Sequence, residues 1–577
     1  MVRYRVEIED AHAHLFRVTM QLPRPQPDQV VQLPVWIPGS YLVREFSRHL
    51  SGLVARQGRR DCAIEALDKS RWRVRCNGTA TLELSYRVYA FDRSVRAAFL
   101  DADRGYFNGS SLFLRAEGRE AQPHVLTLGR LPAGWQVATA MSPGTGRRQW
   151  QSADYAELID HPFEMGRFWR GQFQAGGVAH EIVVTGAWPS LDGERLLQDA
   201  RRVCEQHQRF WHARSHSAAP FGRYLFLVLA VEDGYGGLEH RDSASLVVAR
   251  RDLPRRGMAG QPDGYVTLLG LISHEYFHAW NVKRLRPAEF ESIDHSRENY
   301  TRLLWFFEGM TSYFDDLLLL RAGLIDLDHY LRLVAKGMNA VAGTPGRRVQ
   351  SLADASFDAW IKYYRTDENT PNATVSYYQK GALVAMALDL LLRREGASLD
   401  DAMRWLWQHC DAGPITGDDI ARALREVGGR PFDAELGAWV HGTVDPPLAE
   451  LLQDIGVNVQ AERSTLASRV GLRLSESALG GVQVKSVLLG GAAHAAGLSA
   501  GDEVLAVDGW RVRRLDEAAQ WIQPGRPMEV MLVRDQRVMG LTVTPPTDAT
   551  TGDGVVLRAI ARPKRPQAAR RRAWLEG

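Results

Sequence analysis

Residues 265–282 read YVTLLGLISHEYFHAWNV, and this apolar stretch contains the pattern His274-Glu275-Tyr276-Phe277-His278. If the stretch is a helix, the two histidines lie one turn apart and point from the same face. Two neutral imidazoles at that spacing suit a tetrahedral zinc ion, and Glu275 can act as general base toward a water molecule there. Because the flanks are apolar, the histidines would be costly to bury without a metal. The pattern therefore predicts a zinc centre with His274 and His278 as ligands.

A catalytic zinc site needs a third protein ligand, and carboxylates downstream compete for that role. Glu308 lies inside the apolar stretch LLWFFEGMTSYF, where an unpaired carboxylate is expensive to bury. Glu298 lies in the polar stretch HSRENY, where a solvated side chain is the ordinary interpretation. Asp315 and Asp316 fall two turns after Glu308 and are less favourable. We therefore expect Glu308 to be the third ligand.

Outside this stretch the pattern of the chain changes several times and predicts a multidomain α+β protein. Residues 1–175 alternate between apolar and polar side chains, which indicates an N-terminal all-β domain of sandwich-like form. Residues 176–460 contain an amphipathic helix at 196–212, a buried strand at 223–231, and helical periodicity from 265 to about 439. We interpret 176–460 as the catalytic domain.

The wider motifs resemble a known family. HEYFHAW followed by W-x-x-E-G at 305–309 is similar to the gluzincin metallopeptidases, whose third zinc ligand is a glutamate on a second helix. The longer string HEYFHAWNVKRLRP resembles one branch of that group, the PDZ-containing glycyl aminopeptidases. Further segments match the same branch: PVWIPGSYLVREF at 34–46, SYRVYAFDRSVR at 85–96, HPFEMG at 161–166 and GGLEH at 236–240. The resemblance covers nearly the whole chain and implies a thermolysin-like fold for the catalytic domain.

The resemblance also implies an oxyanion donor on the segment SYYQKG at 376–381. Tyr378 matches the gluzincin tyrosine that donates a hydrogen bond to the developing negative charge, and Tyr377 is the alternative. After Glu308, Thr311 and Ser312 stand where some relatives carry an acid that orients a zinc histidine. The sequence therefore does not decide which side chains orient the zinc histidines.

Substrate recognition is implied by GGLEH. Glu239 matches the carboxylate through which related aminopeptidases bind the substrate's amine, and Gly236 and Gly237 are expected to bind the substrate beside it. His240 stands where the best-known aminopeptidases carry asparagine, so amine recognition can differ in detail.

The C-terminal region resembles a bacterial PDZ domain over residues 461–548. Gly471, Leu472, Arg473 and Leu474 occupy the place of the loop that binds a peptide carboxylate. Peptide capture and a purely structural role are both compatible with this segment. Residues 549–577 include RPKRPQAARRRAW, a basic stretch without periodicity that predicts a flexible tail, with docking on an acidic surface as the alternative.

Composition excludes several classes of protein. The chain has 577 residues, 45% hydrophobic and 24% charged, which is the balance of a globular protein with several domains. A net charge of +3 gives no reason to expect nucleic acid as a partner. The absence of long apolar runs predicts neither a membrane span nor a secretory signal, and four scattered cysteines fit a reducing, cytoplasmic location.

Together these features predict a zinc aminopeptidase with one Zn²⁺ per chain that acts on peptides with a free N-terminus. The family resemblance implies a preference for small first residues, glycine above all, with alanine as the second candidate. A thermolysin-like endopeptidase is the main alternative, because it needs the same zinc chemistry but no amine anchor. An inactive PDZ-bearing adaptor is a remote alternative.

Overall fold

The computed structural model describes the chain except residues 213–218, 478–480, 549 and 553. The chain forms two compact units. One comprises residues 1–300, 322–324 and 409–415, and the other comprises residues 301–321, 325–408 and 416–577. The predicted multidomain α+β class is confirmed, because sheets dominate the first unit while the second combines helices with a C-terminal sheet.

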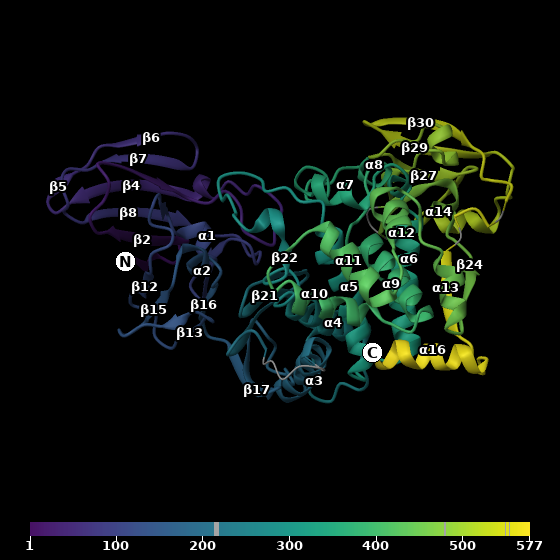
Figure 1. Ribbon diagram of the computed structural model, residues 1–577. Coiled ribbons are helices and arrows are strands. Elements are labelled where there is room, and N and C mark those ends of the chain that lie inside the picture. The colour runs from purple at the N-terminus through teal and green to yellow at the C-terminus, as the bar shows by residue number, and fades with distance from the viewer. Residues whose placement is uncertain (213–218, 478–480, 549, 553) are drawn as a thin grey trace. The chain divides into compact units, whose positions relative to one another are not determined.

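The N-terminal part of the first unit is built around an eight-stranded sheet, drawn in purple and blue in Figure 1, with the strand order β14-β15-β12-β1-β2-β8-β4-β5. Along β1, Val2, Tyr4 and Val6 are buried and alternate with exposed residues, so one face of the strand lies in the core. The strands of this sheet are β1 (Val2–Asp10), β2 (Leu15–Leu22), β4 (Leu50–Gln57), β5 (Arg60–Asp61), β8 (Leu82–Tyr89), β12 (His124–Leu128), β14 (Ser142–Pro143) and β15 (Gln149–Ser152).

Two four-stranded sheets complete this β-rich part. The first has the order β13-β16-β10-β9 and the second β11-β3-β7-β6. Their strands are β3 (Asp28–Gln32), β6 (Ile64–Ala66), β7 (Arg71–Arg75), β9 (Ala98–Leu100), β10 (Arg104–Phe107), β11 (Arg115–Ala116), β13 (Gln136–Ala138) and β16 (Phe163–Gly166). Short helix α2 (Tyr155–Ile159) precedes β16.

A five-stranded mixed sheet with the order β17-β18-β19-β21-β20 follows. Its strands are β17 (Trp169–Ala175), β18 (Val178–Thr185), β19 (Arg223–Val231), β20 (Tyr235–Glu239) and β21 (Ser243–Ala249). Helices α3 (Gly193–His212) and α4 (Asp263–Phe277) pack on each other, and α4 also contacts β20 and β21. This packing places the zinc-motif helix under β20, an edge strand.

The second unit begins with a helical region, drawn in teal and green in Figure 1. Its main helices are α5 (Leu304–Arg321), α6 (Leu327–Ala342), α7 (Leu352–Phe357), α9 (Gln379–Arg394), α11 (Gly417–Gly428) and α13 (Leu448–Asp454), with most of α10 (Leu399–His409). Helices α5 and α9 cross closely, because a Cβ atom on Gly309 would lie 2.6 Å from the Cα of Gly381. Gly309 of the motif W-x-x-E-G and Gly381 of the segment SYYQKG thus allow the backbones of α5 and α9 to touch.

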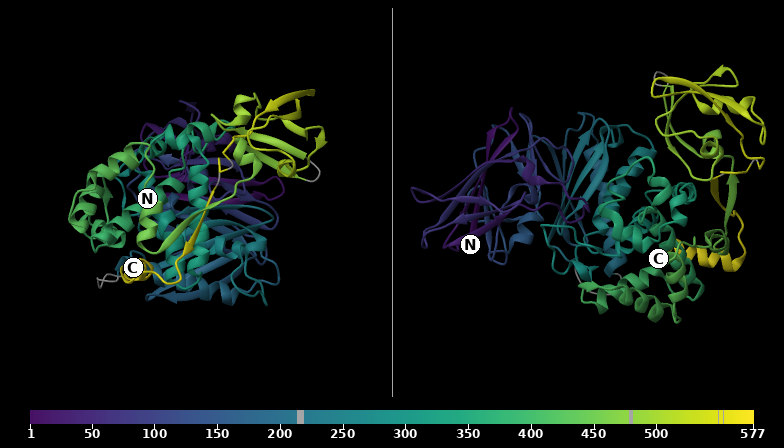
Figure 2. Two further views of the ribbon diagram at one scale, coloured as in Figure 1. Left: turned by 90° about the vertical axis from the view of Figure 1, so that its right-hand side faces the viewer. Right: turned by 90° about the horizontal axis from the view of Figure 1, so that it is seen from above.

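The segment expected to be a PDZ domain forms the sheet β25-β26-β27-β29-β30, with β28 (Trp510–Arg511) beside β27. Its main strands are β25 (Leu472–Ser477), β26 (Gly481–Val487), β27 (Glu503–Val507), β29 (Met528–Arg534) and β30 (Arg537–Val543). Helix α14 (Leu466–Val470) precedes β25, which lies at the edge of the sheet. Figure 2 shows the strand pair β24 (Val457–Glu462) and β31 (Gly554–Ala559) that leads from this sheet toward the C-terminus.

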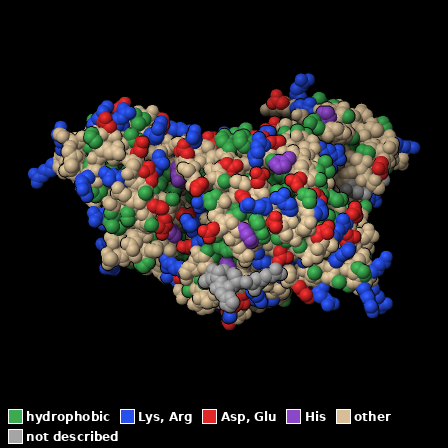
Figure 3. Space-filling model, viewed as in Figure 1, with side chains coloured by type: hydrophobic (Ala, Val, Ile, Leu, Met, Phe, Trp, Pro, Cys, Tyr) green, Lys and Arg blue, Asp and Glu red, His purple; other side chains and the backbone are tan. Residues whose placement is uncertain are grey.

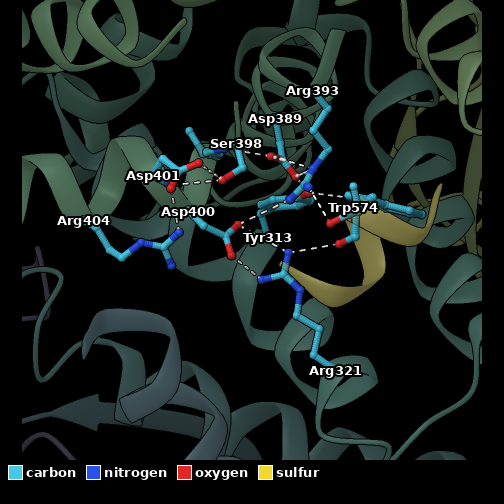
Figure 4. Close-up of polar contacts among 11 residues, drawn as sticks. Tyr313, Arg321, Asp389, Arg393, Ser398, Asp400, Asp401, Arg404 and Trp574 are labelled. Carbon is cyan, nitrogen blue, oxygen red and sulfur yellow. Dashed lines mark hydrogen bonds and ion pairs between the residues drawn. The ribbon is translucent and has the colours of Figure 1, made fainter. Parts of the chain in front are cut away.

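The prediction of a flexible C-terminal tail is wrong. Residues Arg565–Glu576 form helix α16, and the Trp574 side chain is fully buried. Figure 4 shows its polar contacts: Trp574 Nε1 donates to Tyr313 Oη at 2.9 Å, and that hydroxyl donates to Asp389 Oδ2 at 2.6 Å. The sequence did not predict this helix because it has no apolar stripe. The helix is held instead by one buried tryptophan and by hydrogen bonds to its backbone carbonyls.

Among the described residues, no helix is long and apolar enough to cross a membrane. On the face drawn in Figure 3, basic and acidic side chains are interspersed, as the small net charge predicts.

Candidate active site

The two histidines of the zinc motif meet at the C-terminal end of α4. Their Nε2 atoms lie 3.1 Å apart, and the His278 side chain is buried. Nδ1 of His278 donates to the Asn281 carbonyl at 2.8 Å, which leaves its Nε2 as the lone-pair donor. Two ligands on one tetrahedral zinc at ordinary Zn–N lengths would be roughly 3.3 Å apart. The histidine pair therefore fits a single ion.

Glu275 lies beneath the edge strand β20, and its side chain is 5% exposed. A Cβ atom on Gly237 would collide with the carboxylate of Glu275, so this position of the strand accepts only glycine without rearrangement. Arg96, the last residue of the segment 85–96, had no predicted role, and it donates from Nη2 to the Gly237 carbonyl at 3.1 Å. The glycine-rich strand is thus held directly against the predicted general base.

Glu239, at the end of β20, is a buried carboxylate with 5% of its surface exposed. Within the described part of the chain it accepts no hydrogen bond and forms no ion pair. One ligand atom each from Glu239, Glu275 and His278 lie within 4.8 Å of one another. Gly39 packs against Glu239 so closely that a Cβ atom there would be 2.5 Å from Oε1. Glu239 also lines a cavity of about 800 Å³.

His240, the residue after Glu239, binds Asp160. Its Nδ1 donates to Asp160 Oδ1 at 3.3 Å, and its side chain is buried. Burial lowers the pKa of His240 despite the Asp160 carboxylate, so the ring is neutral near pH 7. The histidine that replaces asparagine in this motif therefore contacts the N-terminal β domain.

Glu308 belongs to the second unit, on α5, and is 2% exposed. Its competitors are more accessible: Glu298, in the first unit, is half-buried, as are Asp315 and Asp316 further along α5. Thr311 is also buried, and its hydroxyl donates to the Phe307 carbonyl at 2.6 Å, while Ser312 is half-buried. The burial of Glu308 agrees with the reason for which it was preferred.

The two candidate tyrosines precede α9 in the second unit. Tyr377 is fully buried, whereas Tyr378 is partly exposed and its hydroxyl lies 3.5 Å from that of Tyr364. Burial, and then the negative charge of Glu308, raise the pKa of Tyr378 well above its usual range. The Tyr378 phenol therefore keeps its proton and can donate it in a hydrogen bond.

The predicted carboxylate-binding loop lies between α14 and the start of β25. Gly471 adopts φ +82° and ends α14, while Leu472 packs in the core of the domain. Arg473 Nη2 donates to the Gly343 carbonyl and to Thr344 Oγ1, at 3.1 and 2.8 Å. Leu474 is half-buried. One residue of the loop thus contacts the end of α6.

Three family models match successive parts of the chain. Residues 3–167 match the Peptidase M61 N-terminal domain, residues 267–384 match the M61 glycyl aminopeptidase family, and residues 458–533 match the PDZ domain.

Known structures and curated proteins add three similarities. The structure of an aminopeptidase N family protein from Idiomarina loihiensis is 34% identical, with a TM-score of 0.93 and full coverage of both chains. An M1 zinc metallopeptidase from Deinococcus radiodurans is 15% identical with a TM-score of 0.47, over 78% of this chain and 94% of that one. The zinc metalloprotease RasP of Geobacillus kaustophilus (strain HTA426) is 35% identical over 75 residues, 13% of this chain and 18% of that protein.

Proposed function

Because the chain belongs to the M61 glycyl aminopeptidase family of zinc-dependent peptide hydrolases, we propose that it removes small N-terminal residues from peptides. Glycine is the preferred first residue, as the family description suggests, and alanine is the second candidate. The substrates are peptides with a free N-terminus.

The observation that carries the proposal is that the Glu239 carboxylate is buried without a cation among the described residues. Burying a carboxylate without a cation is costly, and the described residues supply no cation to it. The ammonium group of a peptide N-terminus has the complementary charge and can donate up to three hydrogen bonds. Since Glu239 lies beside Glu275 and His278, an amine held there would bring the first peptide bond to the catalytic groups.

We assign His274, His278 and Glu308 as the ligands of one zinc ion per chain. Two imidazoles and a carboxylate form a donor set that suits catalytic zinc and leaves a coordination position for substrate or water. When bound, zinc polarises the scissile carbonyl and lowers the pKa of a water molecule. The bond from His278 Nδ1 to the Asn281 carbonyl supports this assignment, since it fixes the tautomer that a metal ligand needs.

The remaining chemistry is assigned to two side chains. Glu275 accepts a proton from the attacking water and passes it to the leaving amine. Tyr378 donates a hydrogen bond to the carbonyl oxygen as negative charge develops there, and its raised pKa keeps the donor proton in place. Gly237 allows β20 to approach Glu275, which favours a substrate backbone held along the glycines of that strand.

The competing activity is a thermolysin-like endopeptidase. The cavity of about 800 Å³ beside Glu239 is the observation in its favour, because a longer chain could extend past the anchor. Hydrolysis of Gly-, Ala- and Leu-anilides, compared with an N-acetylated peptide and repeated with a chelator, separates the two activities. The aminopeptidase predicts chelator-sensitive cleavage of the Gly-anilide and little cleavage of the blocked peptide. Internal cleavage of the blocked peptide at a comparable rate would favour the endopeptidase.

For the PDZ domain we propose capture of an extended peptide or chain terminus at the edge strand β25, beside the loop 471–474. The contacts of Arg473 with the end of α6 equally support a packing role for this loop.

A further inference from the structure

Asp160 joins two segments that flank the candidate active site. It follows α2 in the N-terminal β-rich part, and 15% of its side chain is exposed. Oδ2 accepts from the backbone N–H of Arg241 at 3.0 Å, and Oδ1 accepts from His240 Nδ1 at 3.3 Å and from Lys283 Nζ at 2.7 Å. One carboxylate thus binds groups that are 80, 81 and 123 residues away in sequence.

The first segment that Asp160 holds is the end of β20. His240 and Arg241 directly follow Glu239, so two of the three bonds fix the chain next to the proposed amine anchor. The second segment is the turn after α4. The backbone N–H of Lys283 donates to the His278 carbonyl at 3.1 Å, so the residue that Asp160 binds is itself bonded to a proposed zinc ligand.

The turn after α4 needs such support. Val282 adopts φ +127°, a conformation that is strained for a β-branched residue and persists only where the surroundings impose it. Its neighbour Asn281 supplies the carbonyl that orients His278, and its other neighbour is Lys283. The ion pair of Asp160 with Lys283 therefore holds the strained turn from outside.

The charge on Asp160 is maintained by its partners. Burial by itself would raise the pKa of this carboxyl, but Lys283 and His240 lower it far below its usual range. As an ionised carboxylate, Asp160 offers enough acceptor sites for all three donors.

We propose that Asp160 is a positioning residue that sets the distance between the amine anchor Glu239 and the zinc-binding turn after α4. The inference rests on the proposed aminopeptidase function, because a fixed distance between these groups matters only if Glu239 binds the substrate amine. It gives Asp160, the residue directly before HPFEMG, a role in recognition that the sequence did not indicate.

The test is Asp160→Asn, assayed at saturating zinc with Gly-anilide and with N-acetyl-Gly-anilide. Asparagine is uncharged and has one acceptor oxygen, so it cannot bind all three donors. Glu239 should therefore shift. Misplacement of this kind is predicted to lower kcat/KM for the free-amine substrate by about 10- to 100-fold, mainly through KM. The blocked substrate should change by less than about threefold, because it does not use the anchor and His278 keeps its own bond to the Asn281 carbonyl. The double variant Asp160→Asn/Glu239→Gln should be no worse than Glu239→Gln alone.

Glu164→Gln is the matched control. Glu164 is also a buried carboxylate of this domain, paired with Arg104 at 2.8 Å, but it contacts neither flanking segment. It should lose comparable stability without a selective loss on the free-amine substrate. If Asp160→Asn fails to fold, Lys283→Met removes the pair from the other side and should give the same selective loss.

Two outcomes would overturn the inference: wild-type selectivity in the folded Asp160→Asn or Lys283→Met variant, or losses that multiply with those of Glu239→Gln. Failure of the proposed function is distinguishable, because Glu239→Gln alone would then be silent.

Discussion

Replacing Trp574 with alanine is predicted to destabilise the second unit by about 3–5 kcal/mol, the usual range for a fully buried tryptophan. The indole packs against Tyr330 with ring centroids 5.6 Å apart and donates to the hydroxyl of Tyr313. Trp574→Phe keeps most of the ring but removes the donor, so about 1–2 kcal/mol is expected.

The loss of stability should be larger if the whole of helix α16 is removed. Arg393 donates to the Ala573 carbonyl at 2.6 Å, and Arg321 donates to the Trp574 carbonyl at 3.0 Å. Both arginine side chains are buried with Asp389 and Asp400, so deletion of residues 565–577 removes acceptors from a buried charge network (Figure 4). This deletion should cost more than Trp574→Ala.

The assay is urea unfolding followed by far-UV circular dichroism at a fixed zinc concentration. A double-mutant cycle with Tyr313→Phe should show coupling with Trp574→Phe, since the two side chains share one hydrogen bond. A Trp574→Ala protein within about 0.5 kcal/mol of the wild type would refute the reasoning.

Three further predictions concern metal binding, the anchor and pH. Glu308→Ala should lose zinc, measured by mass spectrometry of the purified protein, whereas Glu298→Ala should keep it. Gly39→Ala should lower kcat/KM for free-amine substrates by at least about tenfold with zinc retained, because a methyl group would push on Glu239. Gly177→Ala has a similar φ of +80° and open space, so normal kinetics are expected there, and equal losses in both variants would contradict the explanation. Burial lowers the pKa of four histidines to about 4: His124, His180, His207 and His295. A histidine in the unfolded chain takes up a proton near pH 6.5, whereas these buried histidines stay neutral until about pH 4. Each of these histidines should therefore reduce the free energy of unfolding by up to about 1.4 kcal/mol per pH unit as pH falls from 6.5 to 4. Stability that is flat over this interval in acid titrations would contradict the prediction.

The zinc-motif helix and its neighbours could be predicted because their signals are local. The spacing of His274 and His278 fixes a helical face, and the structure places their Nε2 atoms 3.1 Å apart. The apolar surroundings of Glu308 likewise predicted a buried carboxylate. The choice of Tyr378 over Tyr377, and the roles of all these residues in catalysis, stay predictions.

Long-range contacts could not be predicted from the sequence. Asp160 carries no motif that indicates partners 80 and 123 residues away, and His240 showed only that the motif departs from asparagine. The C-terminal helix was missed because its composition is basic and its only fully buried large side chain is Trp574, within the residues the structure describes. In each case, the tertiary partner rather than the local pattern determines the structure.

The measurement that tests the central claim most directly is the amine selectivity of Glu239→Gln. Charge-assisted hydrogen bonds are worth about 1.5–3 kcal/mol, which corresponds to roughly 10- to 150-fold in kcat/KM. The variant should lose about that factor on Gly-anilide, retain its zinc, and change little on the N-acetylated substrate. A wild-type protein that cleaves free and blocked substrates equally well, together with a silent Glu239→Gln, would contradict the aminopeptidase account.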